Sequence, residues 1–446
     1  MEFSNWKWAA LITACAALAG LPYLGARGQS GGTDPTHYKV VNLGTLTGTS
    51  SEGNTINNIG WSMGSGTQAG NITEHAAVWI YGLRLDLGTL GGPNSDVQWP
   101  VKNDHGLVAG ISETAAMDPY DESWSCTAFT YTGVPTGHVC VGFVWQWGMM
   151  NALPTLGGNN GFAAGANNLG QIVGWAETTV HDTTCVSPQV LQFEPVVYGP
   201  RTGQIKQLPN YPGDPDGAAT AINDAGQTVG ISGICDNAVG ALSAEHALLW
   251  GNGNVIDLGS LGGKGWNTPM AINQRGDIVG FSDLHGDYVD GTLTANFHAF
   301  IWTKESGKMT DIGVLPGDSL SEALDINDQG QVVGLSLPSL HAFIYENGKM
   351  TDLNSLIPSE SPLLLLGANG INDRGEITGQ ACIIADGGCP SSDQTPAFLA
   401  LPVQGANTGD WSVMNTSEVT VPDTVRDKIV RRVLFGHTMP EKVAAN

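Results

Sequence analysis

The chain repeats one short pattern seven times, and this repetition constrains the fold more than any other feature of the sequence. In each copy an Asn is followed by a Gly three residues later and by a second Gly four residues beyond, as in AINDAGQTVG around Asn223. The intervals between successive Asn residues are 46, 64, 56, 50, 54 and 45, a period typical of repeat architectures. The seven copies are centred on Asn57, Asn103, Asn167, Asn223, Asn273, Asn327 and Asn372.

Two further segments accompany the pattern and complete a unit of four short apolar runs. One is HALLW at His246, and the other is IDLGSLGG at Ile256. The unit is therefore predicted to form four antiparallel strands, with the Asn side chain closing the first turn onto backbone amides one or two residues on and the Gly in a left-handed conformation. Because seven copies cannot be seven active sites, we interpret the shared Asn, Gly and His residues as structural.

Seven such units predict an all-β fold, a seven-bladed β-propeller of four-stranded antiparallel blades. The 61 glycines and the low content of charged residues, 13%, agree with many turns and short strands. The repeats open with a lone fourth strand at 38–46 and end with three strands, so we expect the N-terminal strand to complete the last blade. The alternative places DLGTLGG innermost in seven self-contained blades.

The segments HAFIW at His298, INDQGQVVG at Ile326 and DLGTLGG at Asp86 resemble the HAF family of extracellular repeat proteins, named for its His-Ala-Phe triplet. The resemblance covers residues 38–403. It implies bacterial export and a repeat array, and it supplies no catalytic residues to carry over. The second and third units depart from the pattern through long interruptions, which leaves their internal register open.

The N-terminus has the features of a secretory signal peptide, with one Lys before an apolar run and small residues after it. We expect cleavage near Ala26; the alternatives are a lipoprotein signal at Cys15 and a retained membrane anchor. The predicted organisation is given by five segments: 1–26 signal peptide, 27–37 short linker, 38–403 propeller, 404–421 linker, and 422–446 tail with an amphipathic helix. The helix is predicted from the stripe of Val425, Ile429 and Val433, and it docks on the propeller, contacts a membrane or partner, or stays disordered.

Six cysteines follow the signal segment, an even number that favours disulfides over metal in an exported chain. Fifteen pairings exist. Local spacing favours Cys126 with Cys140 and Cys382 with Cys389, which leaves Cys185 for Cys235. Zinc is the alternative, but no Cys or His cluster has ligand spacing.

Eighteen basic and 42 acidic residues give a formal charge of −24, which argues against a nucleic-acid partner. The connections between second and third strands, and between blades, are long and gather aromatic and acidic residues at one end of the predicted ring. Aromatic platforms with carboxylates suit a glycan or peptide. The candidate ligand-binding residues are Trp99, Tyr120, Trp124, Asp214, Asp216, Trp266, Asp283 and Asp287.

The sequence therefore predicts a secreted, cell-surface or periplasmic monomer that acts as a non-catalytic scaffold and binds an extracellular protein or glycan. No cofactor is expected, although the carboxylates at 214–217 and 283–291 offer a structural calcium site that lacks the EF-hand spacing. Membrane contact is expected only through the signal segment or the C-terminal helix. One alternative is a hydrolase or lyase on the same face, with His181 or His285 as base, and another is a purely structural surface protein.

Overall fold

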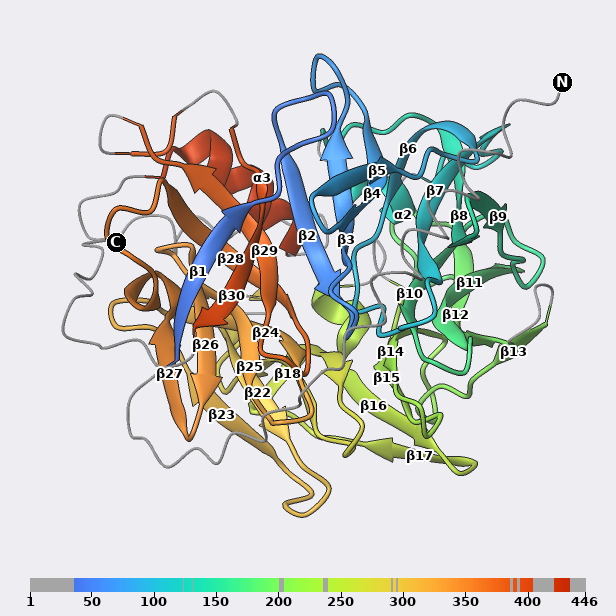
Figure 1. The fold of residues 1–446 in the computed structure, drawn as a ribbon. Coiled ribbons are helices and arrows are strands. Elements are labelled where there is room, and N and C mark those ends of the chain that lie inside the picture. The colour runs from blue at the N-terminus through green and yellow to red at the C-terminus, as the bar shows by residue number, and fades with distance from the viewer. Residues whose placement is uncertain are drawn as a thin grey trace, which may run out of the picture.

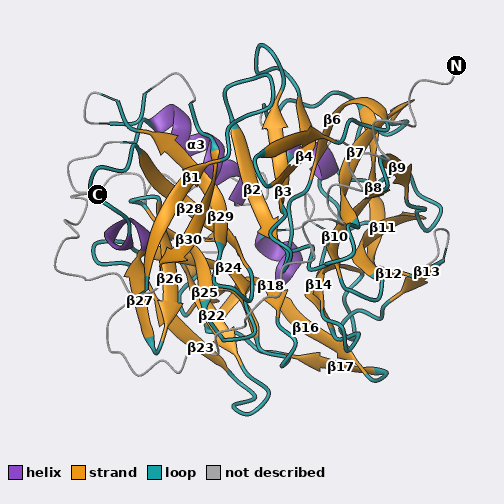
Figure 2. Cartoon of the chain, in the orientation of Figure 1, coloured by secondary structure: helices purple, strands orange, loops and turns teal. Residues whose placement is uncertain are grey.

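The strands of the computed structural model form seven four-stranded antiparallel sheets, the blades of a β-propeller, as the repeat predicts (Figures 1 and 2). The structure describes residues 36–122, 124–130, 132–199, 204–235, 240–289, 292–293, 296–385, 388–390, 394–403 and 421–433. The predicted signal peptide and most of the predicted 404–421 linker lie outside these residues. Among the described residues, no helix is both long and apolar enough to cross a membrane.

The blades follow the chain in order. Blade one consists of β2 (Ser51–Ile56), β3 (Ser62–Thr67), β4 (Glu74–Ile80) and β5 (Leu83–Asp86). Blade two consists of β6 (Gly91–Asp96), β7 (Val108–Met117), β8 (His138–Gln146) and β9 (Met149–Ala152). Blade three consists of β10 (Gly161–Ala166), β11 (Ile172–His181), β12 (Leu191–Tyr198) and β13 (Ile205–Gln207). Blade four consists of β14 (Asp216–Ile222), β15 (Thr228–Gly233), β16 (His246–Gly251) and β17 (Asn254–Asp257). Blade five consists of β18 (Gly262–Ile272), β19 (Ile278–Leu284), β22 (Phe297–Trp302) and β23 (Met309–Gly313). Blade six consists of β24 (Leu320–Ile326), β25 (Val332–Leu337), β26 (His341–Glu346) and β27 (Lys349–Asp352). Blade seven consists of β28 (Leu363–Ile371), β29 (Ile377–Ile383), β30 (Ala397–Val403) and β1 (His37–Asn42). The remaining elements are the hairpin β20 (Tyr288–Val289) and β21 (Thr292–Leu293), the helices α2 (Trp124–Thr127) and α3 (Asp423–Val433), and the 3₁₀ turns Ala241–Ala244 and Leu353–Leu356.

The N-terminal strand completes the last blade and closes the ring. β1 pairs antiparallel with β30, from His37 opposite Val403 to Asn42 opposite Phe398. This pairing decides between the two predicted phases, and the phase with DLGTLGG innermost is wrong. The first strands of neighbouring blades contact one another around the centre, for example β10 with β14 and β24 with β28.

The repeated Asn closes the first turn of each blade, over a longer span than the sequence suggested. In blade four, Oδ1 of Asn223 accepts hydrogen bonds from the amides of Ala225 and Gln227, two and four residues on. Gly226 lies between them with φ of +73°, a conformation that side chains rarely adopt. The turn therefore needs an Asx side chain and a glycine at a fixed spacing.

The second glycine of the pattern is required by a bulge in the neighbouring strand. The register of β14 against β15 shifts between Ala219 and Ala221, which pushes the strand backbone outward. A Cβ atom on Gly230 would overlap the carbonyl oxygen of Ala218. The equivalent glycines of the other six blades meet the first strand in the same way; they are Gly64, Gly110, Gly174, Gly280, Gly334 and Gly379.

The seven Asn residues also link the blades to one another in a closed ring. Nδ2 of Asn223 donates to the backbone carbonyl of Asn273 in the next blade, and Asn372 of the last blade donates to Asn57 of the first. All seven such bonds are present, at 2.8–3.1 Å. The residue after each Asn forms a second closed ring, in which its amide donates to the side-chain oxygen of its neighbour at 2.7–3.0 Å.

The three predicted disulfides are present: Cys126 with Cys140, Cys185 with Cys235, and Cys382 with Cys389. The second pair joins the long connections of blades three and four. All six cysteines lie at or near the end of the ring opposite the Asn turns. Three disulfides indicate that the chain folds in an oxidising compartment.

Substituting Asn223→Asp tests the inter-blade bond while keeping the oxygen that closes the turn. Aspartate cannot donate to the Asn273 carbonyl or to Gln227 Oε1, so we expect the free energy of unfolding to fall by about 1–3 kcal/mol. Urea unfolding measures the change. Asn252→Asp, in an exposed hairpin turn with φ of +52°, is the matched control and should change stability by less than about 0.5 kcal/mol. Equal effects of the two substitutions would contradict a structural role for the ring.

Candidate binding site at the loop-rich end of the ring

The long connections between second and third strands gather at one end of the ring, and the tryptophans predicted to bind a ligand there are buried. Trp99 is 5% exposed and meets Phe129 and Phe162 edge to face, with centroid distances of 5.0 and 4.9 Å. Trp124 and Trp266, 8% and 5% exposed, also pack on other aromatic rings. These side chains fill the interior beneath the loops, and a ligand-binding role for them stays a prediction.

The predicted carboxylates lie at the same end but in separate places. Asp214 lies 2.8 Å from Nδ1 of His246, and Asp216 accepts the amide of Phe193. Oδ2 of Asp287 accepts the amides of Lys264 and Gly265 at 2.6 and 2.9 Å. Asp283 is buried in β19 of the same blade, next to Asp287. The aspartates thus orient loops and neighbouring side chains.

Tyr120 is the one predicted ligand-binding aromatic that faces solvent among the described residues. It is 46% exposed, and its ring meets that of His181 edge to face at 5.2 Å. Of the other candidates, Trp99 and Trp124 line one small cavity together with Phe162 and Trp175. Within the described residues, no three His, Cys, Asp or Glu side chains are arranged to hold a metal ion, so the calcium site at 214–217 and 283–291 stays a prediction.

The C-terminal helix α3 occupies the centre of the loop-rich end. Figure 1 shows it beside the strands of the first and last blades. Its Val425, Ile429 and Val430 are 3%, 8% and 5% exposed and belong to the same apolar cluster as Trp99 and Phe129. Of the three outcomes considered from the sequence, the structure shows the helix docked on the propeller; the side chain of Val433 is not described.

A buried arginine anchors α3 to the first two blades. Nη2 of Arg432 lies 2.6 Å from Glu52, 3.1 Å from Asp96 and 3.5 Å from Glu74, and 3.3 Å from the hydroxyl of Ser65. The three carboxylates come from β2, β6 and β4, and we call them the acidic socket. Arg432 is 5% exposed, so the ion pairs are shielded from water and salt.

The neighbouring arginine holds the helix to the loop of blade two. Arg431 donates from Nη1 to the carbonyl of Thr127 at 2.9 Å and from Nη2 to that of Thr130 at 2.7 Å. Thr127 is the last residue of α2 and Thr130 lies three residues beyond it, close to the Cys126–Cys140 disulfide. A cation at the carbonyl end of a helix is favourable. Two arginines and an apolar stripe thus fix α3 in one orientation.

Beneath α3 lies a small cavity on the axis of the ring, with a lining that is more apolar than polar and includes Trp99. It has a volume of about 40 Å³, enough for a few water molecules. Ile429 and Arg432 of α3 line it together with residues of blades one, two, five, six and seven. The side chains that give it polar character are Glu52, Asn54, Gln98, Asn369 and Gln380.

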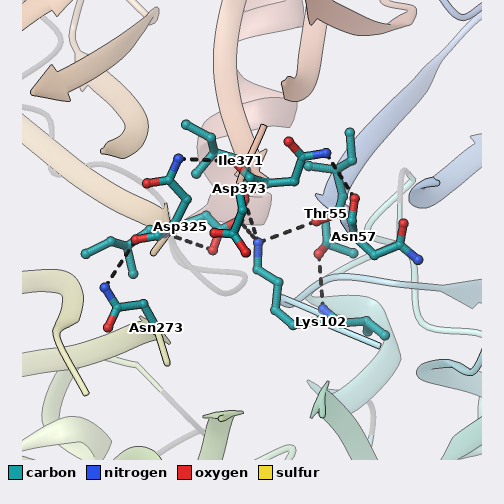
Figure 3. A network of polar contacts seen from close by, with 12 residues as sticks. Thr55, Asn57, Lys102, Asn273, Asp325, Ile371 and Asp373 are labelled. Atoms are coloured by element: carbon teal, nitrogen blue, oxygen red, sulfur yellow. Dashed lines mark hydrogen bonds and ion pairs between the residues drawn. The ribbon is translucent and has the colours of Figure 1, made fainter. Parts of the chain in front are cut away.

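A lysine closes the other end of the axis, near the Asn ring. Nζ of Lys102 lies 2.5 Å from Oδ2 of Asp325 and 2.7 Å from the carbonyl of Ile371, on blades six and seven (Figure 3). The Asp325 side chain is fully buried. Lys102 therefore crosses the centre of the ring from blade two to blades six and seven.

Four buried carboxyl groups at the loop-rich end have pKa values raised far above the usual range of carboxyl groups. Burial raises the pKa of Glu177 and Glu194 to about 7, of Asp283 to about 8 and of Asp216 to about 9. Neighbouring carboxyls add to the effect of burial, since Asp216 is hydrogen-bonded to Asp182 and the three other acids also lie close to a carboxyl group. All four acids are at most 6% exposed.

The sequence did not reveal the acidic socket or the Lys102 crossing. One signal was visible, because five of the eighteen basic residues follow Val421 in a strongly acidic chain. Two of the partner carboxylates stand at equivalent positions of the repeat, since Glu52 and Asp96 each follow a serine and pair with the residue after the second glycine of the pattern. Glu74 lies in β4, and the sequence gave no sign that the three acids meet one arginine.

No family model matches the sequence, and no curated protein matches it. Among solved structures, a similar fold occurs in an acylaminoacyl peptidase of Pyrococcus horikoshii, with 10% identity over 76% of this chain and 50% of that chain and a TM-score of 0.43. An oligogalacturonate lyase of Vibrio parahaemolyticus has 10% identity over 82% of this chain and 97% of that chain, with a TM-score of 0.42. A puromycin-hydrolyzing peptidase of Mycobacterium tuberculosis has 11% identity over 76% of this chain and 62% of that chain, with a TM-score of 0.35. The chain spans half the length of the first peptidase. At these identities the likeness concerns the fold alone.

The raised pKa values predict that the protein is most stable in mild acid. In the unfolded chain carboxyls titrate near pH 4, whereas in the folded protein these groups keep their protons to about pH 7–9. Stability is then fully present below about pH 4 and is lost as the pH rises through the folded pKa values, by about 1.4 kcal/mol per pH unit for each group. Thermal unfolding midpoints should fall between pH 5 and pH 8.

Asp216→Asn isolates one of these groups, because the amide cannot ionise. We expect its midpoint to fall less than that of the parent protein over the same pH range. Asp423→Asn, at a side chain that is 86% exposed, serves as the control and should follow the parent protein. An unchanged slope in the Asp216 variant would contradict the assignment of a bound proton to this site.

Proposed function

We propose that the protein is an exported, non-catalytic binding scaffold that holds a polypeptide partner at the centre of its loop-rich end. The observation that carries the proposal is the docking of α3, because this surface already holds a polypeptide segment through apolar packing and two arginines. Of the two ligand classes predicted from the sequence, a protein is favoured over a glycan, since the tryptophans expected to stack on sugar rings are buried.

The alternative of a hydrolase or lyase on the same face requires acid and base groups that a substrate can reach. The carboxyls with the most strongly raised pKa values at this end are buried, among them Asp216 at 0% and Asp283 at 1% exposure. Their raised pKa values follow from burial within the blades. This arrangement favours a structural role for these acids. The candidate bases His181 and His285 are exposed, so the alternative rests on these two histidines.

The proposal is tested by asking whether the docking surface accepts a free polypeptide. A protease site placed within 404–420 of the full chain is cut after folding, and a fluorescent peptide of residues 421–446 is added. We expect the peptide to exchange with the cut segment and its fluorescence anisotropy to rise with saturation. A peptide of the same composition in scrambled order is the control. Failure of both peptides to bind, or equal binding of both, would refute a specific polypeptide site.

A further inference from the structure

The acidic socket gathers three buried acidic side chains around the guanidinium of Arg432. Glu52, Glu74 and Asp96 all lie within 3.5 Å of one guanidinium nitrogen, and each is at most 4% exposed. The guanidinium of the neighbouring Arg431 also interacts electrostatically with Glu52 and Glu74, so Arg432 is the central cation of the cluster and Arg431 a second one. Burial raises the pKa of Asp96 to about 7, although Arg432 opposes this rise. Without a cation, the three acids would repel one another in a site closed to water.

Arg432 fills the socket incompletely. Its Nε is buried and donates no hydrogen bond within the described part of the chain, and Oδ1 of Asp96 accepts none there. A donor and an acceptor are thus both left over in the same ion-pair cluster. Buried polar groups in a permanent contact are almost always paired, so an unpaired donor beside an unpaired acceptor marks a fit that another ligand can improve.

We propose that the acidic socket is an arginine-recognition site for an external polypeptide, and that Arg432 is a self-ligand that occupies it until displaced. This inference rests on the proposed binding function and names the ligand class. The partner presents the chemistry of α3: two apolar residues four apart, as at Val425 and Ile429, and an arginine three residues after the second.

Arginine suits this socket better than lysine for two physical reasons. Its guanidinium is weakly hydrated and keeps its charge when buried, whereas burial lowers the pKa of an ammonium group. Its five N–H donors in a fixed plane can also reach several carboxylates at once, which matches acids that arrive from β2, β4 and β6. The socket thus discriminates by chemistry as well as by charge.

The tether makes α3 an effective competitor. The helix belongs to the same chain as the socket, so its binding there is intramolecular and its effective concentration is high. A free partner of similar sequence therefore binds the intact protein weakly. The tail would keep the site closed until a partner with a better fit, or one held close by, replaces it.

Peptide-side substitutions test the arginine without disturbing the propeller. Peptides of residues 421–446 carrying the natural sequence, Arg432→Gln, Arg432→Lys or Arg426→Gln are titrated onto the folded protein cut within 404–420. We expect Arg432→Gln to bind roughly 100-fold more weakly, because it leaves buried carboxylates unpaired. Arg432→Lys should fall between the two. Arg426→Gln is the matched control, since Arg426 pairs with an exposed Asp423, and should bind within about twofold of the natural peptide.

The outcomes separate the two proposals. If the natural and Arg432→Gln peptides bind equally well, the arginine inference is overturned while the polypeptide site stands. If no peptide binds, the proposed function fails first. If the Arg432→Gln peptide binds more weakly than the natural peptide and the Arg426→Gln peptide does not, the socket recognises arginine.

The intact chain tests the role of Arg432 as a competitor. We expect the uncut parent protein to bind the natural peptide at least about tenfold more weakly than the cut protein does, and uncut Arg432→Gln to recover most of that loss. Equal binding by the uncut parent and uncut Arg432→Gln proteins would refute the self-ligand. Circular dichroism and thermal unfolding confirm that the Arg432→Gln chain is folded before binding is measured.

Discussion

The closed ring of seven asparagine side chains is the constraint on which the rest of this structure depends. Each asparagine does two things at once, because Oδ1 closes its own turn and Nδ2 donates to the carbonyl of the next blade. The second ring, one residue further along, repeats the link between the same blades. Since both rings close from Asn372 to Asn57 and from Asp373 to Asn58, blade number and curvature are fixed at this end.

Fixing one end with shared residues leaves the other end free to vary. The connections at the Asn end are short except in blade two, where residues 97–107 separate β6 from β7. The connections at the loop-rich end differ in length and carry the three disulfides. Loops of this length lose much conformational entropy on ordering, and cross-links and buried aromatic clusters offset that loss. The loop-rich end is therefore where residues outside the repeat gather, and both the acidic socket and α3 lie there.

The candidate site shows why composition can indicate a surface without identifying its contacts. Aromatic and acidic residues do converge at the predicted end, but Trp99, Trp124 and Trp266 support the loops from inside. The residues that hold α3 are Glu52 and Asp96, which occupy equivalent positions in the first strands of two blades, and Glu74 in β4. Their convergence requires the ring to bring two blades together and the chain to return from its far C-terminus.

The sequence by itself determined the seven blades, the closure of the last blade by the first strand as the favoured phase, and the disulfide pairing favoured by spacing. These depend on local chemistry: turns that need Asn and Gly at fixed positions, strands of fixed period, and cysteines close in sequence or in adjacent repeats. Only the tertiary structure decided the two inter-blade rings, the crossing of Lys102 to Asp325, and the docking of Arg432. Each of these joins residues that are far apart in the chain, and their contact follows from ring closure rather than from any local preference.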